Sequence, residues 1–438
     1  MEEVQVIGAG LAGSEAAWQL AKQGLRVRLW EMRPGTTTPA HSTGCAAELV
    51  CSNSLKSDNP DSAAGLLKRE LEMLDSLILR CARANTVPAG TALAVDRDAF
   101  AASVTHALET QINITFVHEE RTVLDPCAWT VVAAGPLASP ALAEVLTQLV
   151  GCEYLSFYDA AAPIVAADSL DNFRVFAASR YGKGGEGDYL NCAMNEQEYA
   201  TFYQALIAAK RVIPKNFERR ELFTACQPIE EIARKGFDTL RFGALKPVGV
   251  DDPRTGRYPY ALVQLRAENT ARDLYNLVGF QTNLTFSEQR RVFSLIPGLE
   301  RAEFLRYGVM HRNTFVDAPR VLNPDLSLKT APRLFLAGQI TGTEGYLEAA
   351  ASGLIAARNI AARLRRQEPS LLPPTTALGA LLSYATDPTT VEYQPMHVNF
   401  GLMPPLHPPV RNKRNRYQAY AQRALRDLSD WLEISHER

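Results

Sequence analysis

The stretch VQVIGAGLAGSEAAWQLAKQGLRVRLWEM, residues 4–32, restricts the possible folds more than any other part of this sequence. An alternating apolar segment leads into Gly8, Gly10 and Gly13 at the spacing G-x-G-x-x-G, followed by a helical pattern and a second apolar run. The three glycines permit a tight turn, a close backbone approach to a pyrophosphate, and close packing of helix on sheet. The stretch therefore predicts the first strand, helix and strand of a Rossmann-like α/β domain.

The ligand expected at this turn is a nucleotide-containing cofactor. Its phosphate would meet the loop and helix start formed by Gly8, Ala9, Gly10, Leu11, Ala12 and Gly13. Glu31 follows the second apolar run, where a carboxylate can accept hydrogen bonds from ribose hydroxyls, which favours an adenine dinucleotide without a 2′-phosphate. From this part of the chain alone, the ligand could be NAD, FAD or S-adenosylmethionine.

A second glycine-rich region, RLFLAGQITGTEGYLEAAASGLIAARNIAARL at 333–364, narrows the choice of ligand. It predicts a strand, a loop and a long helix of small residues, and with TVVAAGP at 130–136 it resembles flavoproteins whose FAD-binding domain is discontinuous in sequence. In those proteins the late loop contacts the flavin and its linker, so we expect such contacts from Gly338, Gln339, Thr341 and Gly342. A third pattern, Gly182, Gly184 and Gly187, precedes no helix and predicts a mobile loop instead.

Length and composition are those of a soluble multidomain enzyme. The chain has 438 residues, 46% hydrophobic and 21% charged, with a formal net charge of -2. No leader pattern and no membrane-length apolar run occur, so we expect a cytoplasmic protein without a membrane partner. Its seven cysteines include no C-x-x-C pair, which predicts free thiols and no metal site.

Seven segments together resemble the folate- and FAD-dependent tRNA (uracil-5-)-methyltransferase family: GAGLAGSEAAWQLA, CSNSLKSD, SRYGKGGEGDYLNCAMN, TACQPIEEIARKG, LRFGALKPVG, AGQITGTEGYLEAAASG and NFGLMPPL. The likeness runs from Val4 to about Arg426. A related family, the flavoproteins that install carboxymethylaminomethyl groups on wobble uridines, shares the glycine fingerprint and the late loop but carries a further helical C-terminal domain. The end of this chain at Arg438 and the wording TEGYLEAAASG favour the methyltransferases.

The resemblance implies formation of 5-methyluridine at uridine 54 in the T loop of tRNA. The implied one-carbon donor is 5,10-methylenetetrahydrofolate, and the implied reductant is NADPH (or NADH) acting through FAD. It further implies a thiolate that adds to C6 of uracil and so makes C5 nucleophilic.

Two cysteines are candidates for this chemistry. Cys226 stands just ahead of a helix expected to start at Pro228 and to end at Lys235–Gly236, where the helix dipole favours a thiolate. The family implies that Cys226 adds to uracil and that Cys51 lies beside the flavin. We therefore assign Cys226 as nucleophile and Cys51 as the base for the C5 proton; the reverse roles, and a Cys51 that only packs against the flavin, stay open.

The pterin of the folate needs a flat partner. The family implies that His311, in MHRNTF, stacks on the pterin, and Tyr346 of the late loop offers a second aromatic plane.

RNA binding is expected from a basic segment near the C-terminus. Residues 411–426 carry six Lys and Arg and no acid, among them Arg411, Lys413, Arg414 and Arg416, with Tyr417 and Tyr420 interleaved to stack on bases. Residues 205–246, around Cys226, add nine basic against five acidic residues. A solvated helix face is the alternative meaning of such a run.

The expected organisation is a first part of the FAD-binding domain at 1–165, an inserted α/β domain at 166–301 that carries the loop and Cys226, and a second part of the FAD-binding domain at 302–438. An amphipathic helix is expected at 62–80. Two alternative functions remain: a wobble-uridine modification enzyme or another FAD-dependent oxidoreductase, and a non-catalytic flavin-bound RNA-binding protein.

Overall fold

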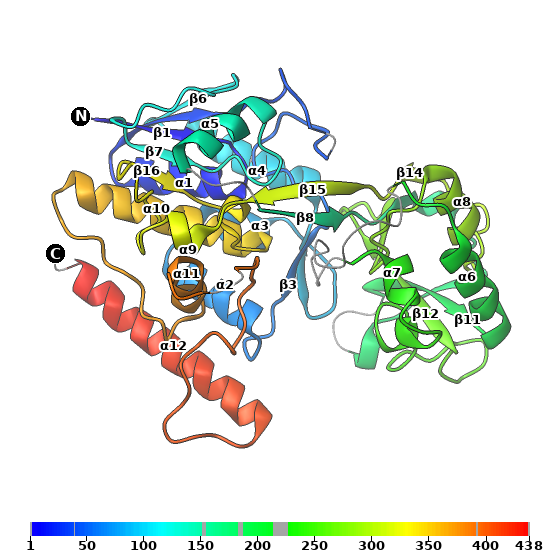
Figure 1. Ribbon diagram of the computed structural model, residues 1–438. Coiled ribbons are helices and arrows are strands. Elements are labelled where there is room, and N and C mark those ends of the chain that lie inside the picture. Colours follow the sequence, from blue (N-terminus) through cyan, green and yellow to red (C-terminus); the bar gives the residue numbers. More distant parts are fainter. Residues whose placement is uncertain are drawn as a thin grey trace.

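The computed structural model describes residues 2–38, 40–150, 155–182, 187–212, 227–390 and 393–436, with the backbone alone at 155–160, 310–314 and 435–436. Two lobes share the described chain (Figure 1). One lobe holds both ends of the sequence, and the other is built from its middle.

The first lobe is centred on a parallel five-stranded sheet in the order β16-β7-β1-β2-β6. Its strands are β1 (Glu3–Ile7), β2 (Arg26–Trp30), β6 (Ile114–Val117), β7 (Thr130–Val132) and β16 (Leu334–Leu336). Strand β1 pairs with β2 from Glu3↔Arg26 to Ile7↔Trp30 and with β7 from Gln5↔Thr130 to Ile7↔Val132. Strand β16 pairs with β7, although 201 positions separate their ends in the sequence. The predicted Rossmann-like sheet, discontinuous in sequence, is therefore confirmed.

Two helices pack together beneath this sheet in the view of Figure 1. They are α1 (Leu11–Lys22) and α10 (Tyr346–Leu364), which begin at the two glycine-rich turns. Strands β7 and β16 are buried along their whole length, as the runs TVV and LFL lead one to expect of parallel strands covered on both faces, although β16 lies at the edge of the sheet. The carboxyl ends of the strands and the first turns of both helices thus meet at one edge of the sheet, where α/β proteins bind ligands.

The other helices of this lobe are α2 (Ala63–Met73), α3 (Leu77–Ala84), α4 (Arg97–Thr110), α5 (Pro140–Val150), α9 (Ala318–Val321), α11 (Ala377–Thr386) and α12 (Lys413–His436). A small sheet in the order β3-β5-β4 joins them: β3 (Ser54–Ser57), β4 (Thr86–Val87) and β5 (Ala92–Val95).

The single helix expected at 62–80 is wrong, because the chain breaks there between α2 and α3. Asp75 adopts a left-handed conformation with φ of 54°, and Ser76 accepts the N–H of Leu79 as the cap of α3. The buried carboxylate of Glu15, in α1, accepts the N–H groups of Leu77 and Ile78. When the free N–H groups of a helix start are bonded by a side chain from another helix, the spacing of apolar residues does not reveal that start.

The second lobe has an antiparallel six-stranded sheet in the order β10-β11-β12-β13-β9-β14 and its own apolar core. The strands are β9 (Ile164–Ala166), β10 (Val175–Ala177), β11 (Tyr189–Met194), β12 (Ala261–Ala267), β13 (Leu274–Leu277) and β14 (Phe304–Arg306). Helices α6 (Glu196–Ala208), α7 (Ile229–Ala233) and α8 (Phe286–Phe293) belong to this lobe. The expected boundaries at 165/166 and 301/302 stay a prediction; the second sheet itself runs from Ile164 to Arg306.

An antiparallel ribbon lies between the two lobes (Figure 1). It consists of β8 (Leu155–Ala160) and β15 (Met310–Phe315), paired from Leu155↔Phe315 to Ala160↔Met310. The chain therefore enters and leaves the second lobe side by side.

Candidate active site

The first pocket lies at the start of α1 and has a volume of about 980 Å³. Gly10 lines it, and a Cβ at Gly10 would have no heavy atom within 4 Å, so the backbone at Gly10 borders open space. No side chain caps α1 and its first turn holds no acid, which leaves the positive end of the helix for an anion. Gly8 and Gly13 make this geometry possible, because a Cβ at Gly13 would lie 1.8 Å from the carbonyl oxygen of Gly8.

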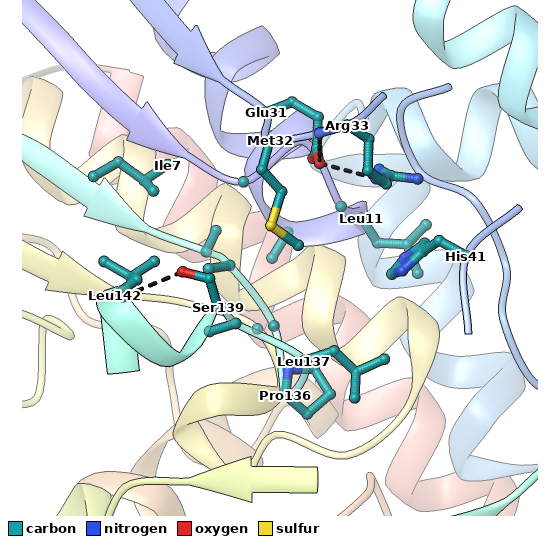
Figure 2. A pocket seen from close by; sticks show the side chains of 18 of the residues that line it. Ile7, Leu11, Glu31, Met32, Arg33, His41, Pro136, Leu137, Ser139 and Leu142 are labelled. Carbon is teal, nitrogen blue, oxygen red and sulfur yellow. Dashed lines mark hydrogen bonds and ion pairs between the residues drawn. The ribbon is translucent and has the colours of Figure 1, made fainter. Parts of the chain in front are cut away.

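A buried network of charged side chains, Glu31, Arg33 and Glu48, forms one wall of this pocket, just after the end of β2. Glu31 accepts the N–H of Ala9 at 2.8 Å and the Nε of Arg33 at 2.9 Å (Figure 2). Arg33 also donates to Glu48 at 3.0 Å. Burial by itself raises the pKa of Glu31, but the hydrogen bonds and charge of Arg33, with the Ala9 N–H, hold this pKa below its ordinary value. Glu31 is therefore ionised at neutral pH.

His41 lies on the same wall. Burial, together with the charge of Arg33, lowers the pKa of His41 to about 4. The imidazole is therefore neutral near pH 7, and Arg33 supplies the positive charge on this side. Arg33, Glu48 and His41 were not predicted as site residues, since nothing in their spacing links them to the glycine fingerprint.

The opposite wall is the late loop between β16 and α10. The N–H of Gly338 donates to Oγ of Ser352 at 2.7 Å. The hydroxyls of Thr341 and Thr343 both donate to the carbonyl oxygen of Gly338, at 2.8 and 2.9 Å. Gln339 donates to Glu344 at 2.8 Å. These bonds fix the loop, so Gly338 and Gln339 face the pocket in a defined position.

Cys51 opens onto a second pocket, of about 830 Å³, that adjoins the first. Both pockets are lined by Val50, Pro136, Leu137, Gln339 and Tyr346. The sulfur of Cys51 lies 3.0 Å from the phenol oxygen of Tyr346, across 295 positions of sequence. The structure thus brings two predicted site residues together where the pockets meet.

The second pocket also holds an ion pair that was not predicted from the sequence. Lys56 Nζ lies 2.6 Å from Oε1 of Glu348, in the first turn of α10, and both residues line the pocket. The pair joins the segment after Cys51 to the helix that carries Tyr346.

The predicted cofactor residues divide into two groups. Those that line the first pocket are Gly8, Gly10, Leu11, Ala12, Glu31, Gly338 and Gln339. Those that act behind it are Ala9, through its bond to Glu31; Gly13, against Gly8; Thr341, against Gly338; and Gly342, against the ring of Tyr393. The sequence therefore indicated the right loops. The structure adds which of their residues line the pocket and which hold the lining residues in place.

Cys226 lies outside the described residues, so its geometry stays a prediction. The helix after it, α7, begins at Ile229 with Pro228 as its N-cap and ends at Ala233; the expected start at Pro228 and exit at Lys235–Gly236 are wrong by one or two positions. Glu230 fixes this helix start by accepting the N–H of Asn283 at 2.7 Å.

The start of α7 is tied to the second pocket. The N–H of Ile229 donates to the carbonyl oxygen of Gln281 at 2.7 Å, and Gln281 lines the pocket that contains Cys51. Three positions of chain, which span at most about 10 Å, separate Ile229 from Cys226.

His311 is the second residue of β15, with Asp159 of β8 as its cross-strand partner. Its side chain lies outside the described part of the structure. Its expected contact with a pterin therefore stays a prediction.

The basic segment occupies the loop before α12 and its first turns. Arg411, Lys413 and Arg414 are exposed and Arg416 is half-buried. Tyr417 and Tyr420 instead pack on Phe400, with ring centroids 4.6 and 5.5 Å away. The charges are available to a polyanion, and the two half-buried tyrosine rings help to dock the helix; their expected stacking on bases stays a prediction.

Within the described ranges, no group of three or more His, Cys, Asp or Glu side chains could hold a metal ion. In the same part of the chain, no helix is both long and apolar enough to cross a membrane.

Comparison with known proteins places the site in context. The family model described as glucose inhibited division protein A (GIDA) matches residues 3–368. The chain is 57% identical over 424 residues to the methylenetetrahydrofolate--tRNA-(uracil-5-)-methyltransferase TrmFO of Moorella thermoacetica, covering 97% of each chain. It is 56% identical over 438 residues to the protein of the same name from Carboxydothermus hydrogenoformans, covering 99% of this chain and 100% of the relative.

Among solved structures, the chain resembles Aquifex aeolicus GidA in its form II crystal, with a TM-score of 0.69 and 17% identity. The match covers 98% of this chain and 73% of that one. At this identity the likeness concerns the fold alone, and it agrees with the parallel sheet and second lobe described above.

Proposed function

This chain belongs to the GIDA family and, within it, to the methylenetetrahydrofolate–tRNA-(uracil-5-)-methyltransferases, and we propose that the junction of its two pockets is where uridine is methylated. The chain is an enzyme that forms 5-methyluridine in tRNA with 5,10-methylenetetrahydrofolate as one-carbon donor. The observation that carries the proposed location is Cys51, whose sulfur meets Tyr346 where the two pockets join.

The first pocket suits FAD. The uncapped start of α1 beside Gly10 would hold the pyrophosphate, and the ionised Glu31 would accept ribose hydroxyls. Gly338, Gln339 and Tyr346 would border the flavin, toward the second pocket. Bound there and reduced by NADPH, FAD supplies the electrons that convert the methylene to a methyl group.

Two thiols would perform the uracil chemistry. The Cys226 sulfur bonds to C6, and the electrons of the C5–C6 double bond move toward the C4 carbonyl oxygen, so that C5 becomes nucleophilic and bonds to the one-carbon unit. Cys51 then takes the hydrogen of C5 as a proton. The electron pair left behind would form a double bond from C5 to the methylene as the bond between the methylene and its donor nitrogen breaks. A hydride supplied by reduced FAD would add to this methylene, which becomes the methyl group, and the electrons of the new double bond would return to C5–C6 as the Cys226 sulfur leaves as a thiolate.

The bond between Ile229 and Gln281 supports this pairing of thiols, because it ties the chain just after Cys226 to a wall of the Cys51 pocket. Tyr346 lines both pockets and is our candidate for stacking on the pterin, with His311 as the second candidate.

The T arm of tRNA would dock on the exposed cations ahead of and within the first turn of α12, which are Arg411, Lys413 and Arg414. Such a substrate is encountered in the cytoplasm, where we place the enzyme.

The test is mass analysis of T-arm RNA after incubation with the full chain, FAD, NADPH and labelled methylenetetrahydrofolate. We expect one labelled methyl group at the T-loop uridine. Activity with wobble uridine in place of the T loop, or methylation without consumption of folate, would contradict the proposal. A purified protein that is colourless and takes up no FAD would return S-adenosylmethionine to consideration.

The thiol roles are tested with RNA that contains 5-fluorouridine, which cannot lose its C5 substituent as a proton. Wild type and Cys51→Ala are expected to form a covalent RNA adduct, and Cys226→Ala to form none. An adduct with Cys226→Ala would exclude Cys226 as the nucleophile.

A further inference from the structure

The hydroxyl of Tyr346 makes three close contacts, all with one short segment. Its oxygen accepts the N–H of Cys51 at 2.9 Å and the N–H of Ser52 at 3.2 Å, and it lies 3.0 Å from the Cys51 sulfur. A phenol has one hydrogen to donate and two lone pairs to accept with. Since the two backbone N–H groups occupy the lone pairs, the hydrogen of Tyr346 is left for the sulfur. The contact therefore has a direction: oxygen donates and sulfur accepts.

The segment around Cys51 is also held by three arginines from elsewhere in the chain. Arg97 donates to the carbonyl oxygen of Leu49 at 2.5 Å, and Arg306 donates to that of Val50 at 2.7 Å. Arg266, from β12 of the second lobe, donates to Ser52 Oγ at 2.9 Å and to Asn53 Oδ1 at 2.7 Å.

The charges around this segment do not cancel. Against the three guanidinium groups stand two buried carboxylates: Glu268, which is ion-paired to Arg97, and Glu344, which lines the same pocket as Cys51. Lys56 and Glu348, on another wall of the same pocket, neutralise each other. The described surroundings of the sulfur thus carry excess positive charge in a half-buried site, which favours an anionic sulfur.

We infer that Tyr346 is a positioning residue that donates its hydroxyl hydrogen to Cys51 and, with Arg97 and Arg266, holds Cys51 as a thiolate ready to take a proton. This inference rests on the proposed function only for the identity of that proton, the hydrogen on uracil C5. It goes beyond a stacking role, because the ring of Tyr346 can border a cofactor while its hydroxyl controls the thiol.

The state of the phenol agrees with this role. Burial, with the neighbouring Cys51, raises the pKa of Tyr346 well above its ordinary value. The phenol therefore keeps its hydrogen at any pH at which the enzyme works, and remains a donor.

The experiment measures the ionisation of Cys51 directly. FAD-loaded full-length protein is alkylated with iodoacetamide between pH 5 and 10, and the rate at Cys51 is read from its peptide by mass spectrometry. In wild type we expect the rate to reach half its maximum at least one pH unit below the value of about 8.5 for an ordinary thiol. A midpoint at or above the ordinary value would overturn the inference without any variant.

The matched variants remove one hydroxyl each. Tyr346→Phe keeps the ring and is expected to raise the midpoint by about one to two pH units, the worth of a hydrogen bond to a charged group. Tyr384→Phe is the control: its hydroxyl donates to the carbonyl oxygen of Gln394 at 3.0 Å, and it lines neither pocket. An unchanged midpoint in Tyr346→Phe, or an equal rise in Tyr384→Phe, would contradict the assignment.

A methylation assay separates this inference from the proposed function. One outcome is that Tyr346→Phe raises the pH midpoint of Cys51 alkylation while Cys51→Ala still methylates tRNA at the wild-type rate. In that case Tyr346 controls the ionisation of Cys51, and the proposed role of Cys51 as base is wrong. If Cys51→Ala is inactive and the Tyr346→Phe midpoint is unchanged, the base role stands and the inference fails.

Discussion

Gly353 of α10 lies against the backbone of Ala12 in α1, so closely that a Cβ at Gly353 would come within 2.1 Å of the Ala12 carbonyl oxygen. The two helices begin at the two glycine-rich turns that wall the first pocket. Their contact therefore fixes the early and late halves of the pocket relative to each other.

The first prediction concerns this helix contact. Gly353→Ala is expected to push α1 from α10, to destabilise the first lobe by about 1–3 kcal/mol, and to lose FAD. Gly10→Ala is the contrasting variant, because its Cβ meets no protein atom but enters the pocket. It should keep the wild-type thermal midpoint and bind FAD more weakly. Flavin fluorescence on titration and thermal denaturation of the apoprotein measure the two effects; equal stability of Gly353→Ala and wild type would refute the packing argument.

The second prediction concerns Glu31. Glu31→Gln removes a carboxylate that accepts from Ala9 and Arg33, and so leaves Arg33 buried with Glu48 as its remaining carboxylate partner. We expect FAD affinity to fall by about tenfold or more, the effect of losing one charge-assisted hydrogen bond. Glu3→Gln, on the neighbouring strand β1, is the control because its pair with Arg28 is partly exposed. Retention of wild-type affinity in Glu31→Gln would exclude a ribose contact.

The third prediction is a pH dependence set by Glu70. Its buried carboxylate accepts the N–H groups of Ala377 and Leu378 at the start of α11. Burial outweighs these bonds and raises the pKa of Glu70 from 4.5 to about 7. Because the folded state binds the proton more tightly, the stabilisation is complete below pH 4.5 and is lost as pH rises through 7, to a total of about 3 kcal/mol at most.

Hydrogen exchange of the amides of α11 measures this effect. After correction for intrinsic exchange, protection should fall between pH 5 and pH 7.5 in wild type and stay level in Glu70→Gln, whose side chain does not titrate. Protection that rises with pH in wild type would reverse the sign of the argument.

The fourth prediction concerns RNA. Replacing Arg411, Lys413 and Arg414 with Ala should weaken tRNA binding and reduce the slope of log affinity against log salt by roughly one per lost phosphate contact. The control replaces three other exposed cations, Arg320, Arg365 and Arg366. Filter binding at several salt concentrations gives both quantities, and equal slopes for the two triple variants would argue against this surface.

The sequence predicted the parts of the site that depend on local backbone. The fingerprint at Gly8, Gly10 and Gly13, the acid at Glu31 and the loop at Gly338 each require a residue type at a fixed spacing, and the structure places all of them at the first pocket or directly behind it. Such requirements are visible without knowledge of the fold.

The remaining contacts could not be predicted because they join distant segments. Arg266 donates to Ser52 and Asn53, which lie more than 200 positions away in the sequence. The sequence around a buried arginine in a strand does not indicate which residue it will bind. The break between α2 and α3 was missed for the same reason, since the carboxylate of Glu15 that satisfies the start of α3 belongs to another helix.

The paired strands β8 and β15 have a consequence for engineering of the chain. Ala160 and Met310 are direct cross-strand neighbours, so the 149 residues between them leave and rejoin the ribbon at one place. A two-residue hairpin turn could close that gap. The second lobe could thus be removed as one continuous segment, and the shortened protein would retain every strand of the five-stranded sheet.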